Sequence, residues 1–296
     1  MNDRSDPGPM SGPSTGNLRG VAWMTLAAFF FAMMIVAGRR VSHLPSIEIT
    51  FFQTGGAVIC LLPWLVARGP GGLRTANLVM HLIRGLAAFA GMSALFYAAR
   101  FTPAADITAL LFLSVLFTVL LAAVFLKERV GFRRWVAILV GFGGALIVIR
   151  PGFESASWSA LIMLFVALAF GAVNTATRFL AGTENLNAIV FYMYGLMCLY
   201  ASVPTILAWE TPYWADVPWL AATGLFAAIA QQGITRSLSM APTAIAMPAY
   251  YLQLPFAAVA GYFLFGEAPG AWIWVGAAVI CGATYYVIRA APPDRR

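Results

Sequence analysis

The sequence predicts an all-α membrane protein in which ten transmembrane helices form two inverted repeats of five. Three observations support this prediction. Hydrophobic residues make up 61% of the 296 residues and charged residues only 10%, whereas about a quarter of the residues in a soluble domain are charged. Apolar segments near the ~20-residue length that crosses a bilayer follow one another with short breaks. The second half of the sequence also resembles the first at an offset of 139 residues, the separation of Arg39 and Arg178.

The apolar segments define ten expected spans. They do not alternate between polar and apolar residues as barrel strands do, so helices are predicted. Cys60, Cys198 and Cys281 fall inside these segments and are expected to be packing residues, not disulfide or metal sites. The spans are expected at roughly residues 20–38, 47–66, 78–99, 104–125, 133–150, 157–178, 188–208, 216–238, 243–265 and 271–289.

The offset aligns charged residues and prolines, which coincide by chance less often than Leu, Ala or Val. Pro103 falls on Pro242, and the tripeptide Val148-Ile149-Arg150 recurs as Val287-Ile288-Arg289. Internal symmetry in a membrane chain is typical of alternating-access transporters. The expected units are a disordered cytoplasmic tail at 1–17, a first repeat at 18–150, a second repeat at 151–290 and a cytoplasmic tail at 291–296.

Positive charges orient the chain, because Lys and Arg gather on the cytoplasmic side of a membrane. With the N-terminus in the cytoplasm, ten spans return the C-terminus there as well. Of the 18 Lys and Arg residues, only Arg39, Arg40, Arg100 and Arg150 then lie outside. The net charge of +7 is therefore interpreted as a topology signal facing anionic lipid, and nucleic acid is not an expected partner.

Five spans are an odd number, so the second repeat is expected to enter the membrane from the opposite side. The loop around Glu128 then faces the cytoplasm and its counterpart around Glu267 faces out. The cytoplasmic loop carries Lys127 and Arg129 and its outer counterpart carries neither, in agreement with the preference of Lys and Arg for the cytoplasmic side. Two inverted halves can exchange conformations that open to opposite sides. This symmetry predicts transport by alternating access.

One motif precedes the fifth expected span. The run Leu111 to Thr118 (LFLSVLFT) is followed by Leu126-Lys127-Glu128-Arg129 and then by Trp135. This pattern resembles the first repeat of the EamA family, in the drug/metabolite transporter superfamily, and the second repeat is similar at Phe265-Gly266-Glu267 and Trp274. The resemblance covers essentially the whole chain after the N-terminal tail. It implies two inverted five-helix repeats around a central substrate cavity, no bound cofactor, and a bacterial inner membrane.

Two further stretches resemble one branch of that family. Glu48 to Phe52 (EITFF) and His81 to Gly85 (HLIRG) look like the branch that contains S-adenosylmethionine and riboflavin uptake carriers. Two positions depart from the pattern. Gln53 stands where an Arg commonly follows the Phe pair, and Val115 stands where a Pro usually follows the Ser. Both lie where the cavity is expected, so the substrate is not inherited from the branch.

Charged residues inside spans are candidates for function, because a charge within a bilayer is costly. Asp106 and Glu48 are expected near the outer face, together with Arg39 and Arg100. They could form an outer gate of ion pairs, or a protonation site that couples transport to the proton gradient. The alternative is that they are hydrated groups at helix ends, where the carboxylates suit the helix dipole.

Arg84 lies within the cytoplasmic end of the third expected span. One interpretation is that it binds an anionic group of the substrate or pairs with an acid at an inner gate. The other is that its long side chain reaches the lipid headgroups and has no role in transport.

Uncharged polar residues near mid-span are the main candidates for a cavity lining, because amide and phenol groups at membrane depth need partners. The offset pairs Gln53 with Tyr192 and Ser114 with Gln253, so polar residues recur at matching depths. Hydrogen bonding between helices is the alternative. Pro255 either opens the ninth span near the substrate or only kinks it. The candidate substrate-binding residues are Gln53, Ser114, Asn174, Tyr192, Gln231, Tyr250, Tyr251 and Gln253, with Arg84.

Other classes of function fit the sequence less well. It contains no HExxH, GxSxG or glycine-rich phosphate loop, and its two histidines do not suggest a metal site. A channel is the more serious alternative, although no filter-like segment occurs. We expect a neutral or zwitterionic polar solute, such as an amino acid or a nucleoside-like compound. Proton coupling, and a monomeric or homodimeric state, stay open.

Overall fold

Helices account for all regular structure in the described residues, and no strand occurs among them. The structure is a computed structural model that describes residues 15–98, 111, 113–128, 130–149, 158–265 and 271–289. In these ranges, 7 helices are long and apolar enough to cross a membrane, and three shorter apolar helices accompany them. The predicted all-α class is confirmed. The number of ten spans and their inversion remain predictions.

The helices follow one another with short connections wherever the chain is described. Their bounds are α1 Thr15–Arg40, α2 Ser46–Arg68, η1 Pro70–Leu73, α3 Leu78–Ala98, α5 Leu113–Phe125, α6 Phe132–Ile149, α7 Trp158–Leu180, α8 Leu186–Leu207, α9 Val217–Met240, α10 Thr243–Ala246, η2 Met247–Leu252, α11 Gln253–Phe265 and α12 Ala271–Arg289.

Most of these bounds lie within a few residues of the expected spans. One correction concerns the N-terminus, where α1 begins at Thr15, inside the tail expected at 1–17. Asn17 is buried in the bundle, so the helix continues beyond the apolar run. The start of the fourth expected span, 104–110, lies outside the described residues.

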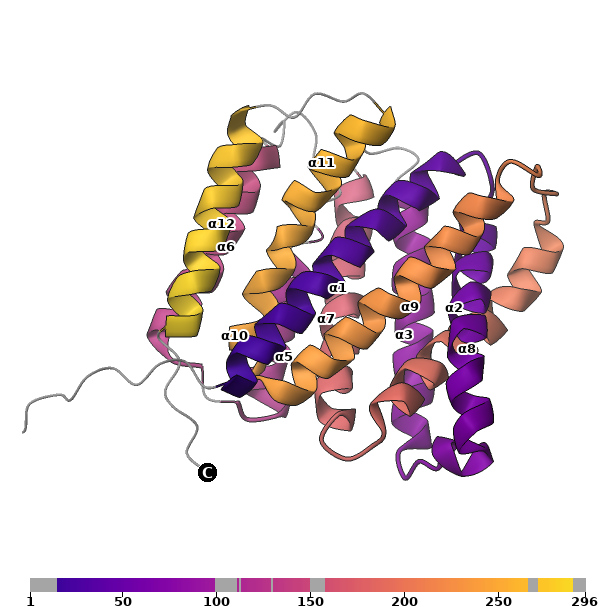
Figure 1. The fold of residues 1–296 in the computed structure, drawn as a ribbon, viewed down its shortest axis with the longest axis horizontal. Helices are drawn as coiled ribbons and strands as arrows, with labels where there is room; N and C mark the ends of the chain where they lie inside the picture. Colours follow the sequence, from indigo (N-terminus) through magenta and orange to yellow (C-terminus); the bar gives the residue numbers. More distant parts are fainter. Residues whose placement is uncertain are drawn as a thin grey trace, which may run out of the picture.

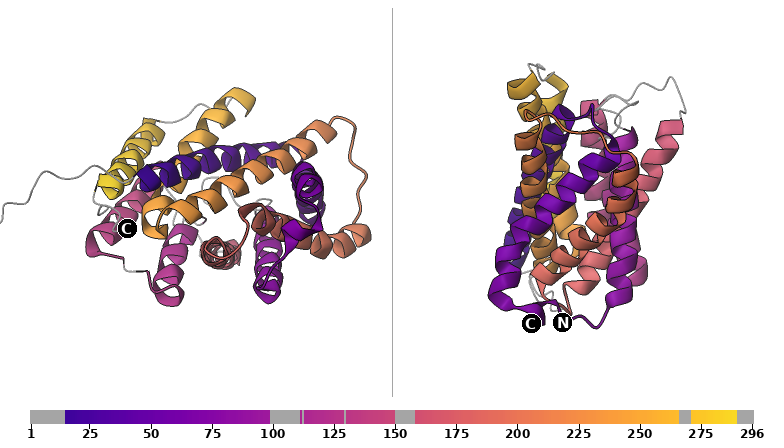
Figure 2. Two further views of the ribbon diagram at one scale, coloured as in Figure 1. Left: turned by 60° about the horizontal axis from the view of Figure 1, so that its bottom comes forward. Right: turned by 90° about the vertical axis from the view of Figure 1, so that its right-hand side faces the viewer.

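The helices form a bundle of inclined elements (Figures 1 and 2). α1 and α9 lie side by side across one face, α6 and α12 pack together at one edge, and α2 packs on α8 toward the other edge. The remaining large contacts join α3 to α7, α5 to α7, α1 to α11, α2 to α9 and α3 to α8.

Small residues allow the closest of these helix contacts. A Cβ atom added to Gly224 of α9 would lie 2.7 Å from the Cα atom of Gly56 in α2, so the two backbones nearly touch. A similar contact joins α3 to α8, where a Cβ atom on Gly85 would lie 2.8 Å from Cβ of Leu196. Close approach of this kind stabilises helix pairs in lipid, where dispersion replaces the hydrophobic effect.

The ninth expected span is broken, and the break lies directly before the helix that contains Pro255. α10 ends at Ala246, and a 3₁₀ segment from Met247 to Leu252 separates it from α11. Pro248 occupies the start of this segment, where it needs no backbone hydrogen bond. Pro255 lies in the first turn of α11 and cannot donate a hydrogen bond to the carbonyl of Tyr251 inside the segment. The break therefore lies between two prolines that each remove a backbone donor.

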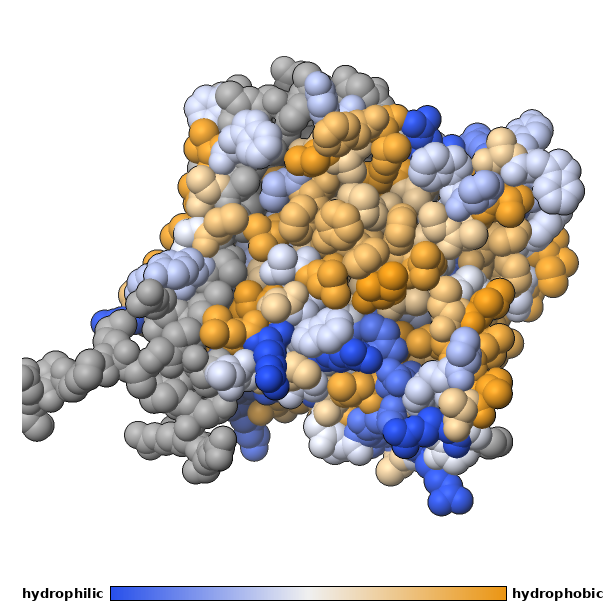
Figure 3. All heavy atoms as spheres, viewed as in Figure 1, coloured by the Kyte–Doolittle hydropathy of each residue, from blue (hydrophilic) through white to orange (hydrophobic). Residues whose placement is uncertain are grey.

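The two ends of the bundle differ in charge. We call the end where α1 begins and α2 ends the basic end, and the other the far end. Figure 3 shows strongly hydrophilic residues gathered along the lower border of one face, below a broad apolar area. Among the described residues, Arg39 and Arg40 close α1 at the far end. The Lys and Arg residues at the basic end include Arg19, Arg68, Arg74, Lys127, Arg133, Arg178 and Arg236.

Candidate functional site

A cavity lies near the middle of the bundle, between helices from both halves of the chain. Its volume is about 40 Å³, enough for roughly two or three water molecules. Binding sites for small molecules usually measure some hundreds of Å³, so a metabolite would require the helices to move apart. The lining residues are Phe31, Met34, Ala88, Met92, Ser114, Phe170, Val173, Asn174, Met193, Tyr194, Met197, Ala230, Gln231, Ile234 and Tyr250.

Four of the predicted substrate-binding residues meet at this cavity. Ser114 comes from α5, Asn174 from α7, Gln231 from α9 and Tyr250 from η2. The Asn174 amide donates a long hydrogen bond, 3.5 Å, to the hydroxyl of Thr118. The Gln231 Nε2 atom is buried and has no hydrogen-bond partner among the described residues. A polar ligand could supply that partner.

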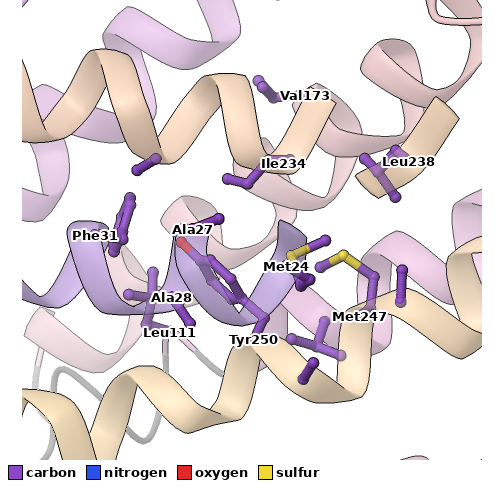
Figure 4. Packing of buried hydrophobic residues seen from close by; sticks show 14 of the residues in the cluster. Met24, Ala27, Ala28, Phe31, Leu111, Val173, Ile234, Leu238, Met247 and Tyr250 are labelled. Atoms are coloured by element: carbon purple, nitrogen blue, oxygen red, sulfur yellow. The ribbon is translucent and has the colours of Figure 1, made fainter. Parts of the chain in front are cut away.

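Aromatic rings and methionines form the rest of the wall. The ring of Tyr250 meets that of Phe31 edge-on, with centroids 5.5 Å apart. Figure 4 shows Tyr250 among Phe31, Ala28 and Met24 of α1. Methionine side chains are flexible and adapt to surfaces of different shape. Such a wall can reshape itself around an inserted solute.

Three more predicted residues are buried but do not line the cavity. The Gln53 amide contacts the sulfur of Met34 at 2.9 Å, and its Oε1 atom has no partner in the described part of the chain. Both amide atoms of Gln253 are likewise unpartnered there. Tyr251 is fully buried beside Gly141 of α6. The Oε1 atom of Gln53 and both amide atoms of Gln253 thus have hydrogen-bonding capacity that no described residue uses.

Tyr194 lines the cavity and was not among the predicted residues. Its hydroxyl donates to the carbonyl of Ala227 in α9 at 2.8 Å. Tyr192, which was predicted, lies elsewhere: its hydroxyl donates to the carbonyl of Leu73 at 2.7 Å, near the basic end. Tyr192 therefore lies on a face of α8 that does not line this cavity. The buried spacing Val190, Tyr194, Met197 gives the better signal.

Arg84 does not line the cavity but lies one turn from it. Its Nε atom donates to the hydroxyl of Thr177 in α7 at 3.0 Å, and Nη1 donates to the carbonyl of Ile189 in α8 at 2.9 Å. Arg84, Thr177 and Ile189 each lie four residues closer to the basic end than a residue of the same helix that lines the cavity. Those lining residues are Ala88, Val173 and Met193. Four residues correspond to about 6 Å along a helix. Arg84 therefore joins three helices just below the cavity.

A second polar layer lies beyond Arg84, at the basic end itself. The Nε2 atom of His81 lies 2.7 Å from Oε2 of Glu184, in the turn between α7 and α8. Oε1 of Glu184 accepts hydrogen bonds from the Thr75 hydroxyl and from the Asn77 amide. Burial alone would raise the pKa of Glu184, but these hydrogen bonds outweigh it and hold the pKa below its usual range. Glu184 is thus an ionised anchor between α3 and the α7–α8 turn.

An ion pair connects the two halves of the chain at the same end. The Nε atom of Arg178, in the last turn of α7, lies 2.8 Å from Oε1 of Glu128, which follows α5. Arg178 also donates to the carbonyl of Leu238 in α9. The second oxygen of Glu128 accepts from the backbone N–H of Thr243 at the start of α10 at 3.1 Å. One pair thus ties four segments together.

The candidates for an outer gate lie apart from the cavity. Glu48 is buried at the start of α2, where it accepts a hydrogen bond from the backbone N–H of Glu210 at 3.0 Å. Its other oxygen has no partner among the described residues. Arg39 is exposed at the end of α1. Asp106 and Arg100 lie outside the described residues, so their predicted roles stay predictions.

A metal-binding group of three or more His, Cys, Asp or Glu side chains does not occur in the described ranges. The cavity instead offers amides, hydroxyls, aromatic faces and thioethers. These groups bind a solute by hydrogen bonds and packing and do not promote a covalent step. The arrangement suits reversible binding at mid-bundle.

Comparison with known proteins gives consistent results. Residues 18–150 match the EamA-like transporter family. The chain is 32% identical to a riboflavin transporter of Rhizobium johnstonii, over 91% of each chain. It is 29% identical to an S-adenosylmethionine uptake transporter of Rickettsia bellii, over 91% of this chain and 93% of that one. It is 30% identical to the pseudopaline exporter CntI of Pseudomonas aeruginosa, over 88% and 93% of the two chains.

One solved crystal structure has the same fold. It superposes with a TM-score of 0.75 at 17% sequence identity, over 90% of this chain and 95% of the other. At that identity the likeness concerns the arrangement of helices alone.

Proposed function

Because the chain belongs to the EamA-like transporter family, we propose that it is a secondary transporter of a small polar metabolite in a bacterial inner membrane. Two inverted five-helix repeats alternate between states that open the central cavity to opposite sides. The solute binds through Ser114, Asn174, Gln231 and Tyr250. Gln53 and Gln253 join them when the cavity widens.

The symmetry of the helix contacts is the observation that carries this proposal. The 139-residue offset turns α1 into α7 and α3 into α9, so it exchanges the contact of α1 with α9 for that of α7 with α3. The offset also turns α5 into α11 and α2 into α8. The contact between α5 and α7 therefore corresponds to the contact between α11 and α1, and the contact between α2 and α9 corresponds to the contact between α8 and α3. The contacts of α2 with α8 and of α6 with α12 map onto themselves. A bundle built in this way supports two related states of similar energy.

Two places of close helix approach lie at positions that the same offset relates. The offset carries Gly56 onto Gly195 and Gly224 onto Gly85. Gly56 meets Gly224 between α2 and α9, and Gly85 meets Leu196, the neighbour of Gly195, between α3 and α8. A Cβ atom on Gly195 itself would meet nothing within 4 Å, so the offset relates the two places of close approach without repeating the glycine pair.

The proposed orientation places the basic end in the cytoplasm, as the distribution of Lys and Arg favours. Glu48 would then lie on the outer side, buried and with one unpartnered oxygen. A carboxyl group in that position can hold a proton when the site is empty and release it to water when the helices part. We propose Glu48 as the proton-coupling residue, with Asp106 as its sequence-predicted companion.

Counterflow in proteoliposomes tests the transport function. The full chain, reconstituted into vesicles preloaded with unlabelled solute, should transiently accumulate labelled solute above its equilibrium level. The solute panel includes riboflavin, S-adenosylmethionine, amino acids and nucleosides. Saturable counterflow is a property of a carrier. Flux that is linear in concentration, without counterflow, would instead identify a channel.

Labelling from either side of the membrane tests the inverted repeat. Arg133 at the start of α6 and Trp272 at the start of α12 are exposed and differ by the repeat offset. Single cysteines at these positions, in a chain with Cys60, Cys198 and Cys281 replaced, should react with an impermeant thiol reagent from opposite sides. Reaction from the same side would exclude the arrangement.

A further inference from the structure

We propose that the transported solute carries a carboxylate and that Arg84 binds it. This inference rests on the proposed transport function and adds the chemical class of the substrate. Three observations carry it: the burial of Arg84, its unused hydrogen-bond donor, and its position one turn from the cavity.

Arg84 is buried almost completely, with 2% of its surface exposed. Its Nε and Nη1 atoms are occupied by Thr177 and Ile189, but Nη2 is buried and has no hydrogen-bond partner among the described residues. A guanidinium stays charged at physiological pH. A buried charge without a counter-ion is unstable in a low-dielectric interior.

Neighbouring carboxylates do not supply that counter-ion in the described part of the chain. Glu184 binds Thr75, Asn77 and His81. Glu128 binds Arg178. Arg84 makes no ion pair with either, and both of its hydrogen bonds go to uncharged oxygens. The missing negative charge is therefore one that a ligand can bring.

The position of Arg84 places this charge within reach of a bound solute. Ala88, which lines the cavity, is one turn from Arg84 on α3, and Met193 is one turn from its partner Ile189 on α8. A solute that widens the cavity by about one helical turn would reach the unused Nη2 donor.

The single cationic group beside the cavity favours a carboxylate over a phosphate as the ligand. A phosphate group carries nearly two charges and is usually held by several cationic groups. Arg84 is a single cation, and the polar groups around the cavity are amides and hydroxyls. A monovalent carboxylate balances this charge, while the aromatic and methionine wall accommodates the remainder of an acidic or zwitterionic solute.

Counterflow with matched pairs of solutes tests the inference. Vesicles containing the full chain are assayed with L-amino acids and their amides, with nicotinate and nicotinamide, with phenyl phosphate, and with riboflavin as an uncharged solute. The carboxylate member of a pair should exchange with at least about tenfold higher apparent affinity than the amide, as expected for a charged hydrogen bond. Arg84→Gln should abolish this preference.

Three variants separate a binding role from a structural one. Arg84→Lys keeps the charge and should keep most of the preference. Thr177→Val removes the acceptor of Nε without changing the charge, and should leave the preference intact. Arg236→Gln alters a basic-end arginine that lies over the ring of Trp23, away from the cavity, and serves as the matched control. Melting of each variant in detergent confirms that it is folded.

The remaining outcomes are distinct. If riboflavin or the amides exchange as well as the acids, or if Arg84→Gln keeps the acid preference, transport stands and the carboxylate assignment is wrong. A preference for phenyl phosphate would equally overturn it. If no solute shows saturable exchange, the transport function fails and the inference fails with it.

Discussion

His81 and Glu184 form a contact of 2.7 Å at the basic end, and the chain's only other histidine, His43, lies 3.1 Å from Asp216 at the far end. Each contact joins the turn between the first two helices of one half to the start of the third helix of the other half. The polarity is reversed, because the turn supplies the acid at one end and the histidine at the other. Under the proposed repeat the two contacts join equivalent segments through different positions, and we infer that they hold the two ends of the bundle closed in a similar way.

The basic-end contact predicts a loss of stability in acid. Hydrogen bonds hold the pKa of Glu184 below its usual value, so this residue stabilises the fold fully above the unfolded pKa of about 4.3 and loses that contribution as pH falls through the lower, folded pKa. The difference in Tm between the wild type and Glu184→Gln should therefore be largest above about pH 5 and should shrink below about pH 4. Melting in detergent across this range measures it.

Glu210→Gln is the control for that experiment. The side chain of Glu210 is exposed, and only its backbone N–H binds Glu48. Its charge lies close enough to the buried Glu48 carboxyl to repel it, so Glu210→Gln should not lower the Tm above pH 5, in contrast to Glu184→Gln. A Glu184→Gln curve that runs parallel to the wild type down to pH 3 would contradict the assigned role of the carboxylate.

The Arg178–Glu128 pair should show energetic coupling. Both side chains are partly buried, and each also binds the backbone of the second half. Single replacements by Gln leave the other charge without its partner, so the double variant should be less destabilised than the sum of the singles. We expect a coupling of about 1–2 kcal/mol in a double-mutant cycle. Additive changes would mean that the two side chains act separately.

The contact between α2 and α9 should not tolerate a methyl group. A Cβ atom on Gly224 would lie 2.7 Å from the Cα atom of Gly56, and backbone atoms cannot move aside cheaply. Gly224→Ala should therefore lower the stability by about 1–3 kcal/mol. Gly195→Ala is the matched control, because a Cβ atom there meets nothing within 4 Å. Equal melting temperatures for the two variants would show that α2 and α9 are farther apart.

The cavity residues should affect solute affinity, whereas Tyr192 should not. Gln231→Leu removes an unpaired amide from the cavity wall and should raise the KM for counterflow about tenfold, with smaller changes in Tm. Tyr192→Phe removes only the hydrogen bond to Leu73. It should cost about 1 kcal/mol of stability and leave KM unchanged. The reverse result would assign the site to the face of α8 that carries Tyr192.

Much of the fold could be predicted from the sequence because lipid imposes simple rules. A span needs about 20 apolar residues, and its backbone must satisfy its own hydrogen bonds. The expected span 271–289 agrees with α12, and 47–66 differs from α2 by no more than two residues at either end. The position of the break in the ninth span was harder to predict, because Pro248 and Pro255 each interrupt the pattern of backbone hydrogen bonds.

The polar residues of the site could be predicted only in part. Ser114, Asn174, Gln231 and Tyr250 were predicted because uncharged polar groups are rare at mid-span, and the structure places all four at the cavity. Tyr194 was not predicted: the spacing of buried residues on its helix marks its face, but the carbonyl that it binds lies on another helix. The position of Arg84 was equally hidden, since Thr177 and Ile189 lie about 100 residues away along the chain.

The sequence by itself determined the helical class, the expected spans and the internal offset, because each depends on the local distribution of apolar and charged residues. Only the tertiary structure decided which polar groups share one space and which are used up in helix contacts. Tyr192 and Tyr194 are two residues apart, but a helix turns by 100° per residue, so they face different neighbours. Those neighbours come from distant parts of the chain, and their positions depend on how the helices pack.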